Sequence, residues 1–335
     1  MPVSAGDKGV IHVNIARRPR RLRNSRIIRD MVHEYDVHLS DLIYPVFVVE
    51  GEGIQQEILS MPGIFHYSLD TFKEHLKEIW DSGIRSILFF GVPNHKDAVG
   101  SEAYNKDGIV QRAIRMTKKN YPEMVCIADI CLCEYTDHGH CGIVRDQKIV
   151  NDETLELLAK AALSCAMAGA DIVAPSDMMD GRIGYMRQKL DRYGYEDVLI
   201  MSYSIKYASG YYGPFREAAH SAPAFGDRQT YQMDWRNRKD ALVEAQLDME
   251  EGADILIVKP GMAYMDILKM ISDRFPLPVC VYSVSGEYSM IKAAALNGWI
   301  DEKRIVMETM TAFKRAGANM IITYYALEIA GWLKD

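Results

Sequence analysis

Short apolar segments alternate with amphipathic helical segments along almost the whole chain, and this alternation narrows the possible folds more than any other property of the sequence. The apolar segments are rich in Val, Ile and aromatic residues, as buried parallel strands are. Repeated β/α alternation predicts a parallel sheet covered by helices, and eight repeats indicate an α/β fold of the TIM (β/α)8 barrel type. The predicted strands are Leu42–Val49, Ser86–Pro93, Val125–Cys133, Ile172–Ser176, Val198–Tyr207, Ile255–Gly261, Pro278–Gly286 and Asn319–Tyr325.

A doubly wound open sheet has the same alternation and remains the structural alternative. The first strand is followed by no Gly-x-Gly-x-x-Gly segment, which disfavours the dinucleotide-binding form of that fold. Glycines such as Gly169 and Gly252 stand where a helix is expected to end before the next strand. The predicted helices are Leu69–Trp80, Asn105–Lys119, Asn151–Gly169, Asp180–Asp191, Lys239–Glu251, one that follows the strand ending at Gly286, Asp301–Ala316 and a last one that ends at Leu333.

The chain divides into an N-terminal arm, residues 1–34, and a catalytic barrel, residues 35–335. The arm carries the basic run Arg17–Arg23. Such runs can bind nucleic acid or act as import signals, and the alternative is a solvated arm or one that embraces another subunit. The whole chain has 335 residues, 48% of them hydrophobic, and a formal net charge of -7. This acidic balance disfavours nucleic-acid binding and favours the solvated or subunit-embracing arm.

Nothing in the sequence predicts export or membrane insertion. Residues 1–14 lack an apolar signal segment, and no run of about 18 apolar residues occurs. Six cysteines in a chain of this length are too few for a disulfide scaffold, which fits a reducing compartment. We therefore expect a cytoplasmic protein with no membrane partner.

Two of the predicted strands end on a lysine. One reads Ile255-Leu-Ile-Val-Lys-Pro-Gly261, so Lys259 stands where the Pro-Gly pair stops the strand, and Lys206 ends the preceding strand. Neighbouring barrel strands bring their C-terminal ends to one pocket, where two ammonium groups repel and one amine is expected to be neutral. A neutral amine attacks carbonyl carbon, so catalysis is predicted, against the alternative that each lysine extends to water.

Three cysteines near the third strand predict a metal site. Cys131 and Cys133 alternate with Asp129 along the expected strand and so share one face, and Cys141 follows in a glycine-flanked loop. Three thiolates suit zinc and leave a fourth coordination position open for water or substrate. We expect the other three cysteines to be buried structural residues.

The segment after Lys206, from Ser209 to about Arg236, is long for a loop of a compact barrel and is predicted to be a lid. It carries Arg216, Arg228 and Gln232 among aromatic residues. Arginines in a lid can grip a carboxylate, although pairing at the surface explains them equally well. Hydroxyl donors at the expected pocket rim are Ser283, Ser285 and Tyr324.

Five segments together resemble one known family. They are Asp129-Ile-Cys-Leu-Cys-Glu-Tyr-Thr-Asp-His-Gly-His-Cys-Gly142, Ala174-Pro-Ser-Asp-Met-Met-Asp-Gly-Arg182, Ser202-Tyr-Ser-Ile-Lys-Tyr-Ala-Ser209, Val258-Lys-Pro-Gly-Met262 and Val284-Ser-Gly-Glu-Tyr288. They strongly resemble porphobilinogen synthase, also called 5-aminolevulinate dehydratase. The resemblance implies a TIM barrel with an N-terminal arm, assembled as an octamer. It also implies a lyase that condenses two molecules of 5-aminolevulinate to porphobilinogen, with loss of two waters, in tetrapyrrole biosynthesis.

The same resemblance assigns roles to residues. It implies Schiff bases at Lys259 for the P-side substrate and at Lys206 for the A-side substrate. Glu244 falls where some members bind an allosteric magnesium ion. The carboxylate-binding and zinc-binding residues implied are Arg216, Arg228 and Gln232 on the A side, Ser285 and Tyr324 on the P side, and Cys131, Cys133 and Cys141 for catalytic zinc.

Two other functions are consistent with parts of the sequence. A class I aldolase would need one Schiff-base lysine and could hold a merely structural metal, so Lys206 would be dispensable. A nucleic-acid or redox-sensing module would use the basic arm and the cysteines, and its DNA binding would depend steeply on salt.

Overall fold

The computed structural model describes residues 15–334, and these divide into two units. The first unit ends at Asp36 and contains the short helices η1 (Pro19–Arg23) and α1 (Arg26–Val32). Ser25 caps α1 by accepting a hydrogen bond of 3.2 Å from the backbone N–H of Ile28. Neither helix buries a residue, and the first fourteen residues of the predicted arm lie outside the described residues.

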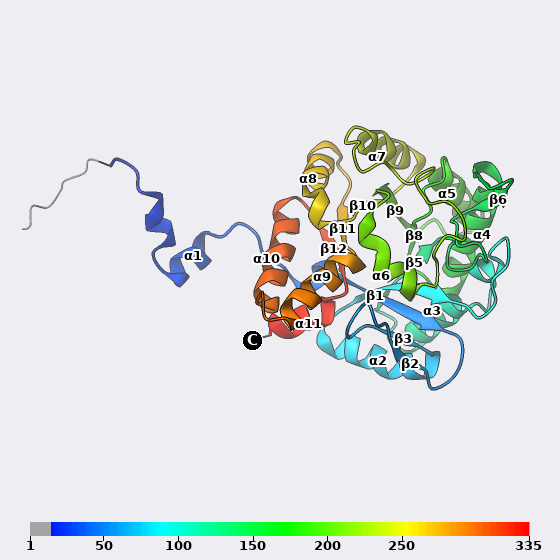
Figure 1. Cartoon of the computed structure of the whole chain (residues 1–335), viewed down its shortest axis with the longest axis horizontal. Coiled ribbons are helices and arrows are strands. Elements are labelled where there is room, and N and C mark those ends of the chain that lie inside the picture. The colour runs from blue at the N-terminus through cyan, green and yellow to red at the C-terminus, as the bar shows by residue number, and fades with distance from the viewer. Residues whose placement is uncertain (1–14, 335) are drawn as a thin grey trace, which may run out of the picture. The chain divides into compact units, whose positions relative to one another are not determined.

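The second unit begins at Val37 and is a closed barrel of eight parallel strands ringed by helices (Figure 1). The ring closes because β12 pairs with β1, with Leu42 opposite Ile321. The TIM-barrel prediction is confirmed, and the open-sheet alternative is wrong because the sheet has no free edge between its first and last barrel strands. In ring order the strands are β1 (Leu42–Val49), β4 (Ser86–Val92), β5 (Val125–Ile130), β8 (Ile172–Pro175), β9 (Leu199–Lys206), β10 (Ile255–Lys259), β11 (Val279–Ser283) and β12 (Met320–Thr323).

Amphipathic helices cover the outside of the barrel. In α2 (Leu69–Ser82), Phe72, Leu76 and Ile79 are buried at helical spacing, and Gly83 ends the helix in the left-handed region. No helix in residues 15–334 is long and apolar enough to span a membrane. The other helices are α3 (Ile109–Asn120), α4 (Asn151–Ala168), α5 (Arg182–Arg192), α6 (Gly213–Ala218), α7 (Asp240–Glu251), α8 (Met265–Arg274), α9 (Ser285–Leu296), α10 (Glu302–Arg315) and α11 (Ala326–Trp332).

Several predicted strands were too long at their C-terminal ends. β5 ends at Ile130, so Cys131 and Cys133 lie in the turn that follows and do not alternate along a strand. Likewise Ser285 begins α9, and Tyr324 follows β12. Apolar residues continue past each strand because the chain stays buried where it leaves the barrel, and burial alone does not reveal where ladder pairing stops.

Short elements between the barrel strands were not predicted. The pairs β2 (Gln55–Glu57) with β3 (Phe65–Tyr67) and β6 (Ile143–Arg145) with β7 (Lys148–Val150) are antiparallel. The long segment after β9 is also partly helical, since it contains η4 (Gly210–Tyr212) and α6. Three-residue strands and single helical turns are too short to show a period in the sequence.

Candidate active site

Lys206 and Lys259 stand side by side at the ends of neighbouring strands. β9 and β10 pair in parallel with Lys206 directly opposite Lys259, and each lysine is 5% exposed. Because the C-terminal ends of barrel strands surround the usual active-site face, the predicted juxtaposition of the two amines is confirmed. Two buried lysines in register are costly unless their charges are compensated or one amine is neutral.

A bulge in β9 determines the direction of the Lys206 side chain. Leu256 lies opposite Ser202, yet Val258 lies opposite Ile205, so β9 contains one extra residue between these pairs. In a regular strand Ser202 and Lys206 would point to the same face, because side chains alternate with a period of two. The extra residue reverses this relation: Ser202 faces Asp248 on α7, whereas Lys206 Nζ donates to the carbonyl of Ser176 after β8.

Lys259 lies in an aromatic pocket that favours its neutral form. Its Nζ is 4.2 Å from the ring centre of Tyr282 and 5.0 Å from that of Tyr203. Burial, followed by the charge of Lys206, lowers the pKa of Lys259 to about 7. A pKa near neutrality makes the neutral, nucleophilic form of Lys259 accessible near pH 7.

Asp129 at the end of β5 faces both lysines. Its Oδ1 accepts a hydrogen bond of 2.7 Å from Ser176, and its Oδ2 has no hydrogen-bond partner within residues 15–334. Burial raises the pKa of Asp129 to about 6, although Lys206 and Lys259 act to lower it. A carboxyl group with this pKa can give or take a proton close to the reacting amines.

The three predicted metal ligands come together. The sulfur atoms of Cys131, Cys133 and Cys141 lie within 4.8 Å of one another, and those of Cys131 and Cys133 are 3.3 Å apart. All three residues are buried, and no other cluster of potential metal ligands of this kind occurs in the described part of the chain. Cys126, Cys165 and Cys280 are buried free thiols elsewhere, as expected.

The thiol groups of this trio differ in acidity. Burial raises the pKa of Cys131, whereas hydrogen bonds from the two neighbouring thiols lower the pKa of Cys141. The charges of Arg228 and Lys206 lower it further. The arrangement therefore already favours one thiolate, and the donor set fits a soft or borderline ion with an open position.

The lid carries three buried donors without partners. Arg216 Nε, Arg228 Nε and Gln232 Nε2 are buried and have no hydrogen-bond acceptor among the described residues. Burial and the charge of Arg228 lower the pKa of Arg216, whereas, despite burial, the charges of Cys133 and Cys141 raise the pKa of Arg228. Buried donors without acceptors are costly, so the arrangement fits a negatively charged ligand.

The lid also contacts the cysteine loop. Arg228 Nη2 donates to the carbonyls of Gly139 and Ser221 at 2.9 and 2.6 Å. A ring nitrogen of His140 lies 2.9 Å from the carbonyl of Phe225. These bonds hold the lid over the cysteines and the ends of the barrel strands.

Comparisons with known proteins agree with this geometry. The family model for delta-aminolevulinic acid dehydratase matches residues 16–332. The chain belongs to this family. A curated relative from Halalkalibacterium halodurans, named delta-aminolevulinic acid dehydratase, is 57% identical to this chain over 319 residues. The match covers 95% of this chain and 97% of the relative. The relative in Bacillus subtilis is 57% identical over 318 residues, covering 95% of this chain and 98% of its own length.

A solved structure from Toxoplasma gondii ME49 also matches. It is a delta-aminolevulinic acid dehydratase (porphobilinogen synthase) in complex with the reaction product porphobilinogen, with a TM-score of 0.95 and 44% sequence identity. The match covers 99% of this chain and 96% of that chain. This member of the dehydratase family is a hydro-lyase of tetrapyrrole biosynthesis that makes porphobilinogen from two molecules of 5-aminolevulinate.

The remaining predicted substrate ligands of this dehydratase lie near the lysines. Tyr324 follows β12, and its hydroxyl is 3.0 Å from that of Tyr282, whose ring contacts Lys259. Ser285 Oγ accepts a hydrogen bond of 3.0 Å from the backbone N–H of Phe215 in the lid. The ring centre of Phe215 is 5.1 Å from Lys259 Nζ, so each hydroxyl bonds to a residue whose ring lies close to Lys259.

Glu244 lies away from this group, on α7. It lines a cavity of about 890 Å³ together with Asp180 and Asp240, and the lid residue Gln232 and His140 of the cysteine loop line the same cavity. Burial raises the pKa of Glu244 to about 7, and Asp248, Asp180 and Asp240 raise it further against the effect of Arg182. The described residues place no three ligand atoms close together there, in contrast to the cysteine trio.

One important residue had no predicted role. Glu287 is fully buried on α9, and its carboxylate accepts hydrogen bonds from the N–H groups of Gly261, Met262 and Val284 at 3.1, 2.7 and 3.0 Å. It thereby joins the segment after Lys259 to the start of α9, where Ser285 lies. The segment that contains it contributed to the family resemblance, but a glutamate in a helix gives no sign that it accepts distant backbone bonds.

Proposed function

We propose that Lys259 and Lys206 each form a Schiff base with one molecule of 5-aminolevulinate. The observation that carries this proposal is the pairing of two buried lysines in register, one of which has a pKa of about 7. A single-lysine aldolase mechanism would not require the second amine.

The chemistry balances with these residues. The neutral Nζ of Lys259 attacks the C4 ketone of the first substrate, a C–N bond forms, and the ketone oxygen leaves as water. Lys206 reacts in the same way with the second substrate. C3 of the A-side substrate, deprotonated next to its imine, attacks C4 of the P-side imine, and the amine of Lys259 then leaves by elimination with a proton from the adjacent carbon. The ring closes when the amino group of the P-side substrate adds to C4 of the A-side imine and Lys206 leaves as the free amine. The protonated imines acidify the adjacent carbon, and Asp129 is placed to take or give the proton.

The carboxylates of the two substrates have separate binding groups in this proposal. Arg216, Arg228 and Gln232 bind the A-side carboxylate, which would supply the acceptors that their buried donors lack. Ser285 and Tyr324 bind the P-side carboxylate, since both lie beside the pocket of Lys259.

Zinc is the metal we propose for Cys131, Cys133 and Cys141. Their close, buried sulfur atoms suit zinc, and three protein ligands are typical of catalytic sites. A bound zinc ion would supply Lewis acidity to a substrate amino group or to water at its open position.

Magnesium at Glu244 is a further proposal. The half-buried carboxylate has three acidic neighbours, Asp248, Asp180 and Asp240, and a cation would relieve their repulsion. Because Mg²⁺ keeps several waters, one or two carboxylates suffice to bind it. Stimulation by magnesium that is lost in Glu244→Gln would support an allosteric role, and unchanged stimulation would contradict it.

We also propose that the arm assembles the subunits into an octamer. Within the first unit, Leu22, Ile27 and Met31 are 56%, 74% and 78% exposed, and apolar side chains this exposed favour cover by another subunit. Light scattering of the full chain and of a form lacking residues 1–34 tests the role of the arm: loss of the octamer is expected, and an unchanged mass would contradict it.

We further propose that the protein is cytoplasmic. Its six free cysteines favour the cytoplasm, where thiols remain reduced.

The experiment for the central proposal follows pyrrole formation from 5-aminolevulinate by colorimetry. Activity should disappear with a zinc chelator and return with added zinc. Pyrrole that persists without metal would make the cysteine trio dispensable, and steep salt-dependent DNA binding would instead favour the nucleic-acid alternative.

A further inference from the structure

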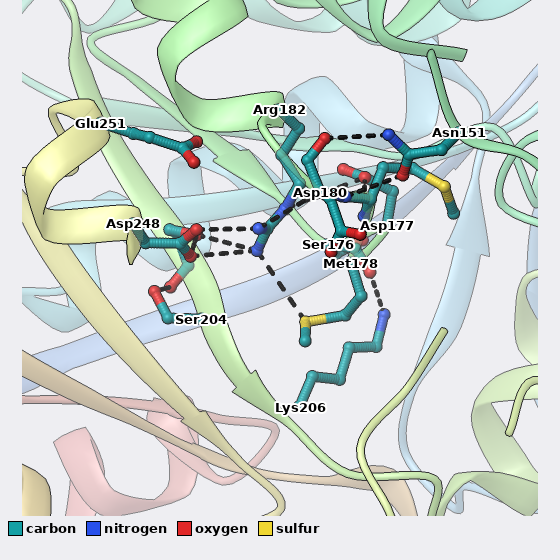
Figure 2. Close-up of polar contacts among 12 residues, drawn as sticks. Asn151, Ser176, Asp177, Met178, Asp180, Arg182, Ser204, Lys206, Asp248 and Glu251 are labelled. Carbon is teal, nitrogen blue, oxygen red and sulfur yellow. Dashed lines mark hydrogen bonds and ion pairs between the residues drawn. The ribbon is translucent and has the colours of Figure 1, made fainter. Parts of the chain in front are cut away.

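A buried ion-pair network lies near Lys206, on the other side of Met178 (Figure 2). Arg182, the first residue of α5, is 2% exposed and pairs with Asp248 of α7, which is also 2% exposed. The pair is bidentate, with distances of 2.8 Å from Nη1 and 3.1 Å from Nη2 to the two carboxylate oxygens. Figure 2 shows the guanidinium between Asp248 and the segment that contains Asp177 and Met178.

One side of this network holds the bulged strand. Ser202 Oγ donates to Asp248 at 2.6 Å and accepts from Arg182 at 3.2 Å. Ser202 is the last residue of β9 in regular register before the bulge, and beyond the bulge Lys206 lies opposite Lys259. The network therefore holds β9 at Ser202, on the N-terminal side of the bulge.

The other side holds the turn that receives the amine of Lys206. Arg182 contacts three consecutive residues there: the carboxylate of Asp177 at 3.8 Å, the sulfur of Met178 at 3.8 Å and the carbonyl of Met179 at 3.4 Å. Met178 has a φ of 69°, a conformation that a non-glycine residue adopts only when its surroundings impose it. Immediately before this turn, the carbonyl of Ser176 accepts from Lys206 Nζ.

We propose that Arg182, held by Asp248, is a positioning residue for Lys206. It fixes both the bulge from which the lysine extends and the turn whose Ser176 carbonyl receives its amine. The inference rests on the proposed function, because a fixed position of the Lys206 amine matters only if this amine forms a Schiff base. Arg182 touches neither lysine and acts through Ser202 and the 176–179 turn.

A role in stability alone explains this network less well. A buried ion pair is often no more stabilising than apolar residues of similar volume, because both charges lose their hydration. Arg182 instead joins the ends of two neighbouring strands beyond the residues at which β8 and β9 pair, and the strained Met178 is among its contacts, two residues from the carbonyl that accepts from Lys206.

The test uses the full-length, zinc-loaded protein with saturating 5-aminolevulinate and borohydride, which reduces each imine to a stable amine. Peptide mass spectrometry measures the adduct on Lys206 relative to that on Lys259 in the same molecules. The main variant is Arg182→Met with Asp248→Leu, which removes the pair without leaving either charge unpaired. Arg187→Met is the matched control, because Arg187 lies on the same helix but bonds to Tyr195 and Val198 and not to the bulge or the turn.

The Lys206 to Lys259 ratio should fall by about 10- to 100-fold in the double variant and stay within about twofold of wild type in the control. An unchanged ratio in the folded double variant would overturn the inference. If the double variant does not fold, Ser202→Ala decides: a ratio reduced by about threefold or more supports the inference, and a smaller change overturns it. Absence of both adducts in the wild type would overturn the proposed function itself.

Discussion

Replacing Lys206 with methionine should make Lys259 more basic. The pKa of Lys259 is lowered from 10.5 to about 7 by burial first and then by the charge of Lys206. Amines on adjacent strands about 5 Å apart repel by about 3 kcal/mol at an effective dielectric constant of 20, which corresponds to about two pKa units. Lys206→Met leaves the burial in place and removes only this repulsion, so the pKa should rise to between about 8 and 9.

The assay measures the initial rate of borohydride trapping of 4-oxopentanoate on Lys259 as a function of pH. This ketone lacks the amino group needed to form a pyrrole, so the adduct reports only the first Schiff base. Since only the neutral amine attacks, the rate should rise with pH through the pKa of Lys259. The midpoint should lie near pH 7 in the wild type and one to two pH units higher in Lys206→Met.

A surface substitution is the control for this experiment. Lys269 is 55% exposed and, among residues 15–334, forms its ion pair with Asp273 on its own helix, so Lys269→Met should leave the midpoint unchanged. A midpoint that stays near pH 7 in Lys206→Met would show that the repulsion between the two lysines does not set the pKa of Lys259. Burial alone would then account for the lowered pKa of Lys259.

Three further predictions follow from the same site. Cys133→Ser should weaken zinc binding by more than about 100-fold and abolish activity, whereas the control Cys165→Ser should retain the metal. Metal analysis after dialysis measures the zinc content of both variants. Zinc retained by Cys133→Ser would refute the role of Cys133 as a ligand. Arg228→Ala should raise KM for 5-aminolevulinate by about 10- to 100-fold, as expected for the loss of a charge-assisted bond; steady-state kinetics with an unchanged KM would contradict the carboxylate role. Glu287→Gln should lower the free energy of unfolding by about 1–3 kcal/mol, because an amide cannot accept from all three N–H groups; denaturant titration measures this, and unchanged stability would contradict it.

The positions of the two lysines could be predicted because local signals and topology agree. An apolar run that stops at Lys259 before a Pro-Gly pair indicates a strand end, and a parallel barrel places all such ends on one face. The cysteine trio was also predicted, but for a partly wrong reason. Cys131 and Cys133 approach each other in a turn after β5 and not by alternation along it.

The bulge in β9 could not be predicted from the sequence. The segment from Leu199 to Lys206 is continuously β-prone, so nothing marks the extra residue between Ser202 and Ile205. Arg182 and Glu287 were missed for a related reason. Their partners are Asp248 and the backbone of Gly261, 66 and 26 residues away, and only the closed barrel brings them together.

The most direct test of the two-lysine account is pyrrole formation by Lys206→Ala, measured by colorimetry with zinc present and 5-aminolevulinate in excess. Borohydride trapping on Lys259 in the same preparation shows that the first Schiff base still forms. The account predicts an adduct on Lys259 but no pyrrole above background, because the second substrate has no amine to bind it. Pyrrole formation close to the wild-type rate would contradict the account and favour a mechanism with a single Schiff base.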